Sequence, residues 1–241
     1  MKKRIDILIK EKELVRSREI AKNLIESGLV KIKGEIIRKP SKKVDIQSEI
    51  EIESLPKYVS RGGEKLEKAL ENFGVNVENL IAVDVGASTG GFTDCLLQKG
   101  VACVYAVDVG NAQLDKILRK DPRVLVYENT DIRNLDNLPQ IADLVVVDVS
   151  FISLTLVLSS VKKLLKPEGK IIALIKPQFE VGKENIGKSG VVKSEKAREK
   201  AIRKVKEWSK SNGFRVLDII NSPIKGSKGN VEYFIFLELS E

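Results

Sequence analysis

The sequence predicts an α/β protein: a doubly wound sheet of seven strands preceded by a small α+β module. Three observations predict it. Short β-branched runs alternate with helical segments from residue 80 onward, a glycine-rich turn follows the first run, and the excess positive charge lies within residues 1–43. At 241 residues, 42% hydrophobic and 32% charged, the chain can bury one large core beside a small module.

The N-terminal segment is patterned as a folded module. Ser17 is a good N-cap, apolar residues recur on one helical face after it, and Gly28 stands where a helix ends, so a helix is predicted over 17–28. A hairpin is expected over 29–37, and Ile46, Ile50 and Ile52 suggest a further strand after Pro40. These elements form a helix-plus-hairpin unit.

The excess of positive charge lies in this module. Residues 1–43 hold 14 Lys/Arg and 6 Asp/Glu, which accounts for the whole net charge of +8. Such a patch is expected of a polyanion-binding module, because each phosphate contact releases counterions. The element order resembles the S4 RNA-binding domain, through Arg16-Ser17-Arg18, Leu24 to Gly28 and Val30 to Gly34. The resemblance implies RNA contacts from Arg4, Arg16, Arg18, Lys22, Lys31, Lys33, Arg38 and Lys39.

Proline and paired glycines mark a boundary after the module. We expect an S4-like domain over 1–57, a linker over 58–63 and the main domain over 64–241. The main domain opens with a helix over 64–73, which carries Lys65.

Strands and helices then alternate. Strands are expected near 80–85, 102–107, 124–127, 144–147, 171–175, 215–220 and 233–239. Helices are expected near 91–99, 111–120, 153–164 and 194–211. The last two strands have a short connection, which suits a sheet whose final strand inserts antiparallel.

The glycine turn after residue 85 lacks the G-x-G-x-x-G spacing of dinucleotide enzymes and the G-K-[ST] of a P-loop, so no phosphate cradle is evident. Asp108 ends the second strand about 20 residues on, where a Rossmann-type fold binds a ribose diol. With Asp84 before the turn, the pattern resembles motif I and the following acidic motif of S-adenosylmethionine-dependent methyltransferases. A helix-capping loop in another α/β protein is the alternative.

This resemblance implies a Rossmann-like methyltransferase sheet that binds S-adenosylmethionine. Asp84 would lie near the methionine ammonium, Asp108 would hold the ribose and Asp131 would contact the adenine. The implied cofactor residues are Asp84, Gly86, Ala87, Ser88, Thr89, Gly90, Gly91, Phe92, Asp108, Asp131 and Asp148.

Four charged residues stand at or near strand ends: Lys65, Asp148, Lys176 and Glu232. In this order they resemble the K-D-K-E tetrad of FtsJ-type ribose 2′-O-methyltransferases. A ribose hydroxyl must lose its proton as it attacks a methyl group, and the chain has no histidine to accept it. Burial and a second ammonium lower the pKa of a lysine, so Lys176 is the candidate base, with Lys65 depressing its pKa or orienting the hydroxyl.

Other acceptors and cofactors fit less well. An amine methyltransferase would show [ND]-P-P-[FY] where this chain has Asp148-Val149-Ser150-Phe151, and a cytosine-C5 enzyme needs a cysteine near a proline. Cys95 and Cys103 have no metal-binding spacing, so no metal is expected.

The whole chain resembles the TlyA family, through the joint Tyr58 to Leu66, the loop 84–93, the segment Leu174 to Glu180 and the motif around 222–233. The family is named both as haemolysin and as ribosomal RNA (cytidine-2′-O)-methyltransferase. Two alternatives stay open: a membrane-lytic protein, and a ribosome-binding factor that holds the cofactor without catalysis. Since no signal peptide or spanning segment is visible, we expect a cytoplasmic protein that acts on ribosomal subunits.

Overall fold

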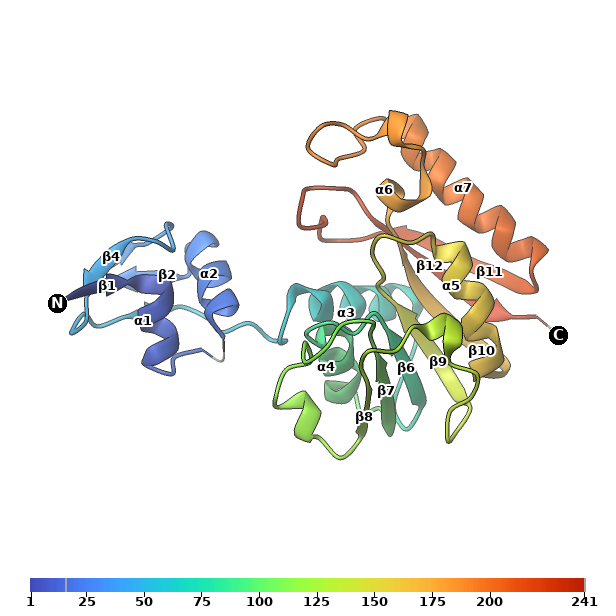
Figure 1. Cartoon of the computed structure of the whole chain (residues 1–241), viewed down its shortest axis with the longest axis horizontal. Helices are drawn as coiled ribbons and strands as arrows, with labels where there is room; N and C mark the ends of the chain where they lie inside the picture. Colours follow the sequence, from blue (N-terminus) through green and yellow to red (C-terminus); the bar gives the residue numbers. More distant parts are fainter. Residues whose placement is uncertain (16, 241) are drawn as a thin grey trace. The chain divides into compact units, whose positions relative to one another are not determined.

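The computed structural model describes residues 1–15 and 17–240. The chain divides into two compact units, Met1–Ser60 and Arg61–Glu241. The division falls inside the stretch 58–63 that the sequence marks as a linker. The first unit holds two small sheets and the second a single seven-stranded sheet, and each unit has its own core (Figure 1).

The N-terminal unit packs two helices against short antiparallel strands. Its core is aliphatic, with Ile5, Ile9 and Ile25 fully buried. Strand β1 pairs with β4, and β2 lies between β3 and β5. The elements are β1 (Lys2–Arg4), α1 (Ile5–Glu11), α2 (Arg18–Glu26), β2 (Val30–Ile32), β3 (Glu35–Ile36), β4 (Lys43–Asp45) and β5 (Glu51–Ile52).

The predicted helix is α2, and Ser17 caps it by accepting a hydrogen bond from the Ile20 N–H at 3.2 Å. Where the sequence suggests one further strand after Pro40, the structure has two, β4 and β5, and of the three isoleucines only Ile52 lies in a strand. A turn at Asp45, whose side chain accepts from the Gln47 N–H, separates β4 from β5. The sequence analysis did not predict β1 or α1. The three residues of β1 form a strand through their pairing with β4, which lies about 40 positions further along the chain.

Helix α3 (Arg61–Phe73) begins three residues before the predicted start at Glu64. Two glycines there suggested a break. They lie in the first turn instead, where backbone N–H groups have no partner within the helix in any case, and Gly63 is buried.

The second unit holds the predicted seven-stranded sheet, in the order β11-β12-β10-β9-β6-β7-β8. The five central and edge strands from β10 to β8 run parallel, and β12 is antiparallel to both of its neighbours. This confirms the predicted fold class. The strands are β6 (Ile81–Val85), β7 (Cys103–Val107), β8 (Val124–Tyr127), β9 (Ala142–Val147), β10 (Leu165–Ile175), β11 (Phe214–Asn221) and β12 (Tyr233–Leu239).

Helices cover both faces of this sheet (Figure 1). On one face, Phe73 of α3 stacks on Phe236 with ring centroids 4.9 Å apart, and Phe92 of α4 packs against Phe234. The alternate residues of β12 join the core of the other face, with α5 and α7. The helices are α4 (Gly91–Gln98), α5 (Leu154–Val161), α6 (Pro177–Glu180) and α7 (Glu195–Ser211), with 3₁₀ turns η1 (Leu118–Lys120), η2 (Ile132–Asn134), η3 (Lys162–Leu164) and η4 (Lys183–Asn185).

The helix predicted over 111–120 is wrong, because η1 is the only helical turn in that stretch. Glu128, after β8, pairs with Arg119 at 2.6 Å. Its carboxylate also accepts three backbone N–H groups, those of Ala112, Gln113 and Leu114. The Arg119 bond, with these N–H groups, lowers the pKa of Glu128 to about 2. The Asp115 N–H, which would bond to residue 111 in a helix, donates to Thr89 O at 3.2 Å instead, and Ala112 has φ of +52°, so no helix forms there.

Candidate active site

Three of the four predicted catalytic residues meet at one edge of the sheet. Asp148 directly follows β9, Lys176 follows β10 and Glu232 precedes β12, and these strands are neighbours. The register pairs Ala173 with Val147 and Ile175 with Tyr233. Since neighbouring strands lie about 4.8 Å apart, the three charged groups share one site.

The four residues form two ion pairs. Lys65 Nζ lies 2.7 Å from Glu232 Oε2, and both side chains are buried. Lys176 Nζ lies 2.5 Å from Asp148 Oδ1 and donates a hydrogen bond to Ser150 Oγ at 2.9 Å. Each carboxylate therefore neutralises and orients one amine, and Lys65 reaches the strand edge from α3.

The glycine loop passes close to Asp148. Gly86 has φ of +84°, and a Cβ there would lie 2.6 Å from the Asp148 backbone oxygen, so only glycine fits. Gly90, with φ of +95°, is the N-cap residue of α4. The backbone of the loop thus lies directly beside the carboxyl ends of β6 and β9.

Asp84 is fully buried beneath this loop. Its Oδ2 accepts hydrogen bonds from Thr93 N at 2.9 Å and Thr93 Oγ1 at 2.7 Å. Its Oδ1 is buried without a hydrogen-bond partner among the described residues. Burial raises the pKa of Asp84 to about 7; the Thr93 bonds oppose this, and the charges of Asp148 and Asp108 add to it. A cation that reached Oδ1 would find an uncompensated carboxyl oxygen.

Two further acids follow neighbouring strands. Asp108 follows β7 and accepts from Gly110 N at 2.7 Å and Ser88 N at 2.8 Å. Asp131 lies beyond β8, caps η2 and pairs with Arg133 at 2.5 Å. The Asp108 carboxylate keeps free lone pairs for a diol, whereas Asp131 is already committed to its arginine.

Of the remaining predicted cofactor residues, Ser88 is exposed and Thr89 half-buried, with the Thr89 oxygen accepting from Asp115 N. Ala87, Gly91 and Phe92 are buried. Because the Phe92 ring packs against Phe234, it belongs to the core and offers a ligand only its backbone.

Several residues near the site escaped the sequence analysis. Phe151 is 90% exposed, has a strained φ of +65° and tilts against Phe179 at 5.1 Å. Glu180, buried on α6, accepts from Leu154 N, Ser153 Oγ and Lys204 Nζ, which ties α5, α6 and α7 together behind Lys176. An aromatic residue three positions after Asp148 was the only available signal.

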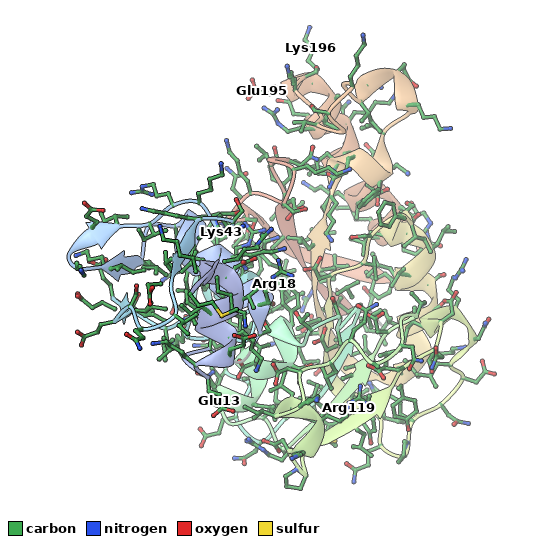
Figure 2. All side chains as sticks on the ribbon, turned by 60° about the vertical axis from the view of Figure 1, so that its left-hand side comes forward. Glu13, Arg18, Lys43, Arg119, Glu195 and Lys196 are labelled. Carbon is green, nitrogen blue, oxygen red and sulfur yellow. The ribbon has the colours of Figure 1, made fainter. Side chains whose placement is uncertain are left out.

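Some of the predicted RNA-binding residues are held in ion pairs within the protein, and others are exposed. Arg4 and Arg18 both pair with the buried Asp6, at 3.0 Å and 2.8 Å (Arg18 is labelled in Figure 2). Burial raises the pKa of Asp6, but the two arginines outweigh it and hold that pKa below its ordinary value. Lys31 pairs with Glu53 at 2.5 Å. The exposed candidates are Lys22, Lys33, Arg38 and Lys39, and Arg16 lies outside the described residues.

Within the described ranges, no helix combines the length and apolar character needed to cross a bilayer. In the same part of the chain, no three His, Cys, Asp or Glu side chains are grouped as potential metal ligands.

Known proteins match the chain from end to end. Residues 58–239 match the FtsJ-like methyltransferase family, and residues 3–50 match the S4 domain. The Bacillus subtilis protein named "Putative rRNA methyltransferase YqxC" is 42% identical over 98% of this chain and 85% of its own length. The Mycobacterium tuberculosis "16S/23S rRNA (cytidine-2'-O)-methyltransferase TlyA" is 41% identical over 97% of this chain and 89% of its own length.

A solved structure, "Putative hemolysin from Streptococcus thermophilus", superposes with a TM-score of 0.80 and 42% identity, over all of this chain and 89% of that one. The fold of this chain thus has a counterpart in a solved protein of similar sequence. The chain belongs to the FtsJ-like methyltransferase family, in the TlyA group that carries an S4 domain ahead of the methyltransferase domain.

Proposed function

We propose that this protein is an S-adenosylmethionine-dependent methyltransferase of ribosomal RNA, which methylates the 2′-oxygen of cytidine riboses. The observation that carries the proposal is the assembly of Lys65, Asp148, Lys176 and Glu232 as two ion pairs beside the glycine loop. The names of the relatives support the ribosomal substrate and the cytidine-2′-O position.

The cofactor site fits the residues present. Asp84 offers the methionine ammonium a buried oxygen that has no hydrogen-bond partner in residues 1–15 and 17–240, and Asp108 offers its carboxylate to the ribose diol. Gly86 and Gly90 let the loop backbone approach the cofactor. When bound, S-adenosylmethionine supplies the methyl group. The remaining chemistry belongs to the chain's own side chains.

Lys176 acts as the general base. As the free amine, it accepts the proton of the ribose 2′-hydroxyl while that oxygen bonds to the methyl carbon. Asp148 and Ser150 fix the direction of the amine, and the Asp148 carboxylate stabilises the ammonium that forms. Lys65, held by Glu232, places a second positive charge near the developing oxyanion.

The S4 domain supplies affinity for RNA, and the target ribose binds at the Lys176 edge of the sheet. The exposed cations Lys22, Lys33, Arg38 and Lys39 supply phosphate contacts. The exposed ring of Phe151, three residues after Asp148, supports a stacking contact with the base of the target nucleotide. Ribosomal subunits as substrate imply that the enzyme works in the cytoplasm.

The test is transfer of labelled methyl from S-adenosylmethionine to purified 30S and 50S subunits, with the modified nucleotide mapped. We expect label on a cytidine ribose with wild type and none with Lys176→Ala. A substrate with 2′-deoxycytidine at the mapped position should bind but accept no methyl. Label on a base, or RNA binding without any transfer by wild type, would refute the proposal; the second result would favour a non-catalytic ribosome-binding factor.

A further inference from the structure

The loop between β11 and β12 folds back onto the carboxylate of Glu232. A Cβ built on Gly226 would collide with Glu232 Oε1 and lie 3.0 Å from its Cδ. Gly226 does not have the positive φ that favours glycine elsewhere in the chain. Its backbone would accept alanine, so the need for glycine comes from the space occupied by Glu232.

This loop cannot easily withdraw. Gly226 N donates to Asn230 O at 2.9 Å, and Gly229 N donates to Gly226 O at 2.8 Å. The Asn230 side chain is buried and bonds two groups of the segment after α6: it accepts from Val192 N and donates to Gly190 O, each at 2.9 Å. The turn that contains Gly226 is therefore held in place by the hydrogen bonds of Asn230.

Glu232 cannot easily withdraw either. Its side chain is only 3% exposed, and its Oε2 accepts the Lys65 Nζ–H at 2.7 Å. A move away from a new methyl group at position 226 would lengthen or break this bond. The Lys65–Glu232 ion pair therefore keeps its geometry only if position 226 has no side chain.

We propose that Gly226 is a positioning residue for methyl transfer: its missing side chain leaves the space in which Glu232 holds the Lys65 ammonium in place. The inference rests on the proposed function, because it assigns a role to the Lys65–Glu232 pair. A methyl group at position 226 displaces Glu232, and Lys65 loses its fixed position while the cofactor loop stays intact.

The test compares Gly226→Ala with Gly229→Ala. Gly229 lies in the same turn with φ of +91°, but a Cβ there meets nothing within 4 Å, so this control strains the turn without touching Glu232. In single-turnover assays, we expect Gly226→Ala to slow methyl transfer about 10- to 100-fold, the scale of a displaced catalytic group. Its dissociation constant for S-adenosylmethionine should stay within about twofold of wild type. Gly229→Ala should transfer methyl at a near wild-type rate per folded molecule.

A rescue experiment separates this role from general damage to the loop. Glu232→Asp shortens the side chain and makes room at position 226, so adding Gly226→Ala to it should cost little further rate. The same double-mutant cycle is followed by urea denaturation, which needs no activity: Gly226→Ala should lower the midpoint clearly in the wild-type background and much less in the Glu232→Asp background.

Equal losses from Gly226→Ala in both backgrounds, in rate or in urea midpoint, would overturn the proposal. So would a Gly229→Ala variant as slow as Gly226→Ala. If the wild-type protein transfers no methyl, the proposed function fails, while the urea cycle still decides whether Gly226 and Glu232 are coupled.

Discussion

Asp84→Asn isolates the titration of one buried carboxyl group. Burial raises the pKa of Asp84 from 3.8 to about 7. The folded state therefore binds this proton more tightly than the unfolded chain does, and the wild-type free energy of unfolding should decrease as pH rises from about 4 to about 7. Asparagine can still accept the Thr93 hydrogen bonds but does not titrate.

The magnitude follows from the size of the shift. About three pKa units at 1.36 kcal/mol each give about 4 kcal/mol as an upper value. The unfolding free energy of Asp84→Asn minus that of wild type should therefore increase by up to about 4 kcal/mol between pH 4 and pH 8. Urea denaturation of both proteins at each pH measures this difference, and groups common to both cancel.

The same ionisation should govern ligand binding. S-adenosylhomocysteine carries the ammonium proposed to contact Asp84, so its affinity should rise about tenfold per pH unit below pH 7 and then level off. Calorimetry with Asp84→Asn should show no such rise. 5′-Methylthioadenosine, which lacks the amino-acid part, is the matched ligand control and should bind wild type without this pH dependence.

Two results would refute this reasoning. A stability difference between the proteins that does not change with pH would contradict the raised pKa. An S-adenosylhomocysteine affinity that depends on pH equally in both proteins would remove Asp84 from contact with the ammonium.

Three further predictions concern other parts of the chain. Lys176→Ala should leave cofactor affinity near normal while methyl transfer falls by a factor of about 10² or more in single-turnover assays; full activity would exclude Lys176 as the base. The affinity for RNA falls as salt rises, and replacing Lys33 and Lys39 together by alanine should make the plot of log affinity against log salt less steep by about two. An unchanged slope would place the phosphate contacts elsewhere. Because Glu128 has a pKa of about 2 against 4.5 ordinarily, its contribution to stability is present above pH 4.5 and is lost as pH falls toward 2. The free energy of unfolding of Glu128→Gln should therefore decrease less than that of wild type as pH falls from 4.5 to 2. Equal decreases in the two proteins would contradict the lowered pKa of Glu128.

The sequence by itself determined the regular elements of the main domain and the residues at their ends. Buried strands such as Ile81–Val85 and Ala142–Val147 are continuous apolar runs, because both faces of a parallel sheet are covered by helices. Parallel strands share one carboxyl edge, so Asp148 and Lys176 could be assigned to one site before any contact was known. The charge excess of residues 1–43 likewise needs only counting.

Tertiary structure alone decided which charged side chains form ion pairs and where a segment with a helical sequence pattern does not form a helix. The stretch 111–120 has a helical pattern, yet Ala112 has φ of +52° and the Asp115 N–H donates to Thr89 O, so the helix does not form. Lys65 and Glu232 are 167 positions apart in the chain, and Gly226 is fitted to a carboxylate that no spacing rule connects with it. Local periodicity reports which face of an element is buried, whereas these contacts depend on the distance between side chains brought together only by the folded chain.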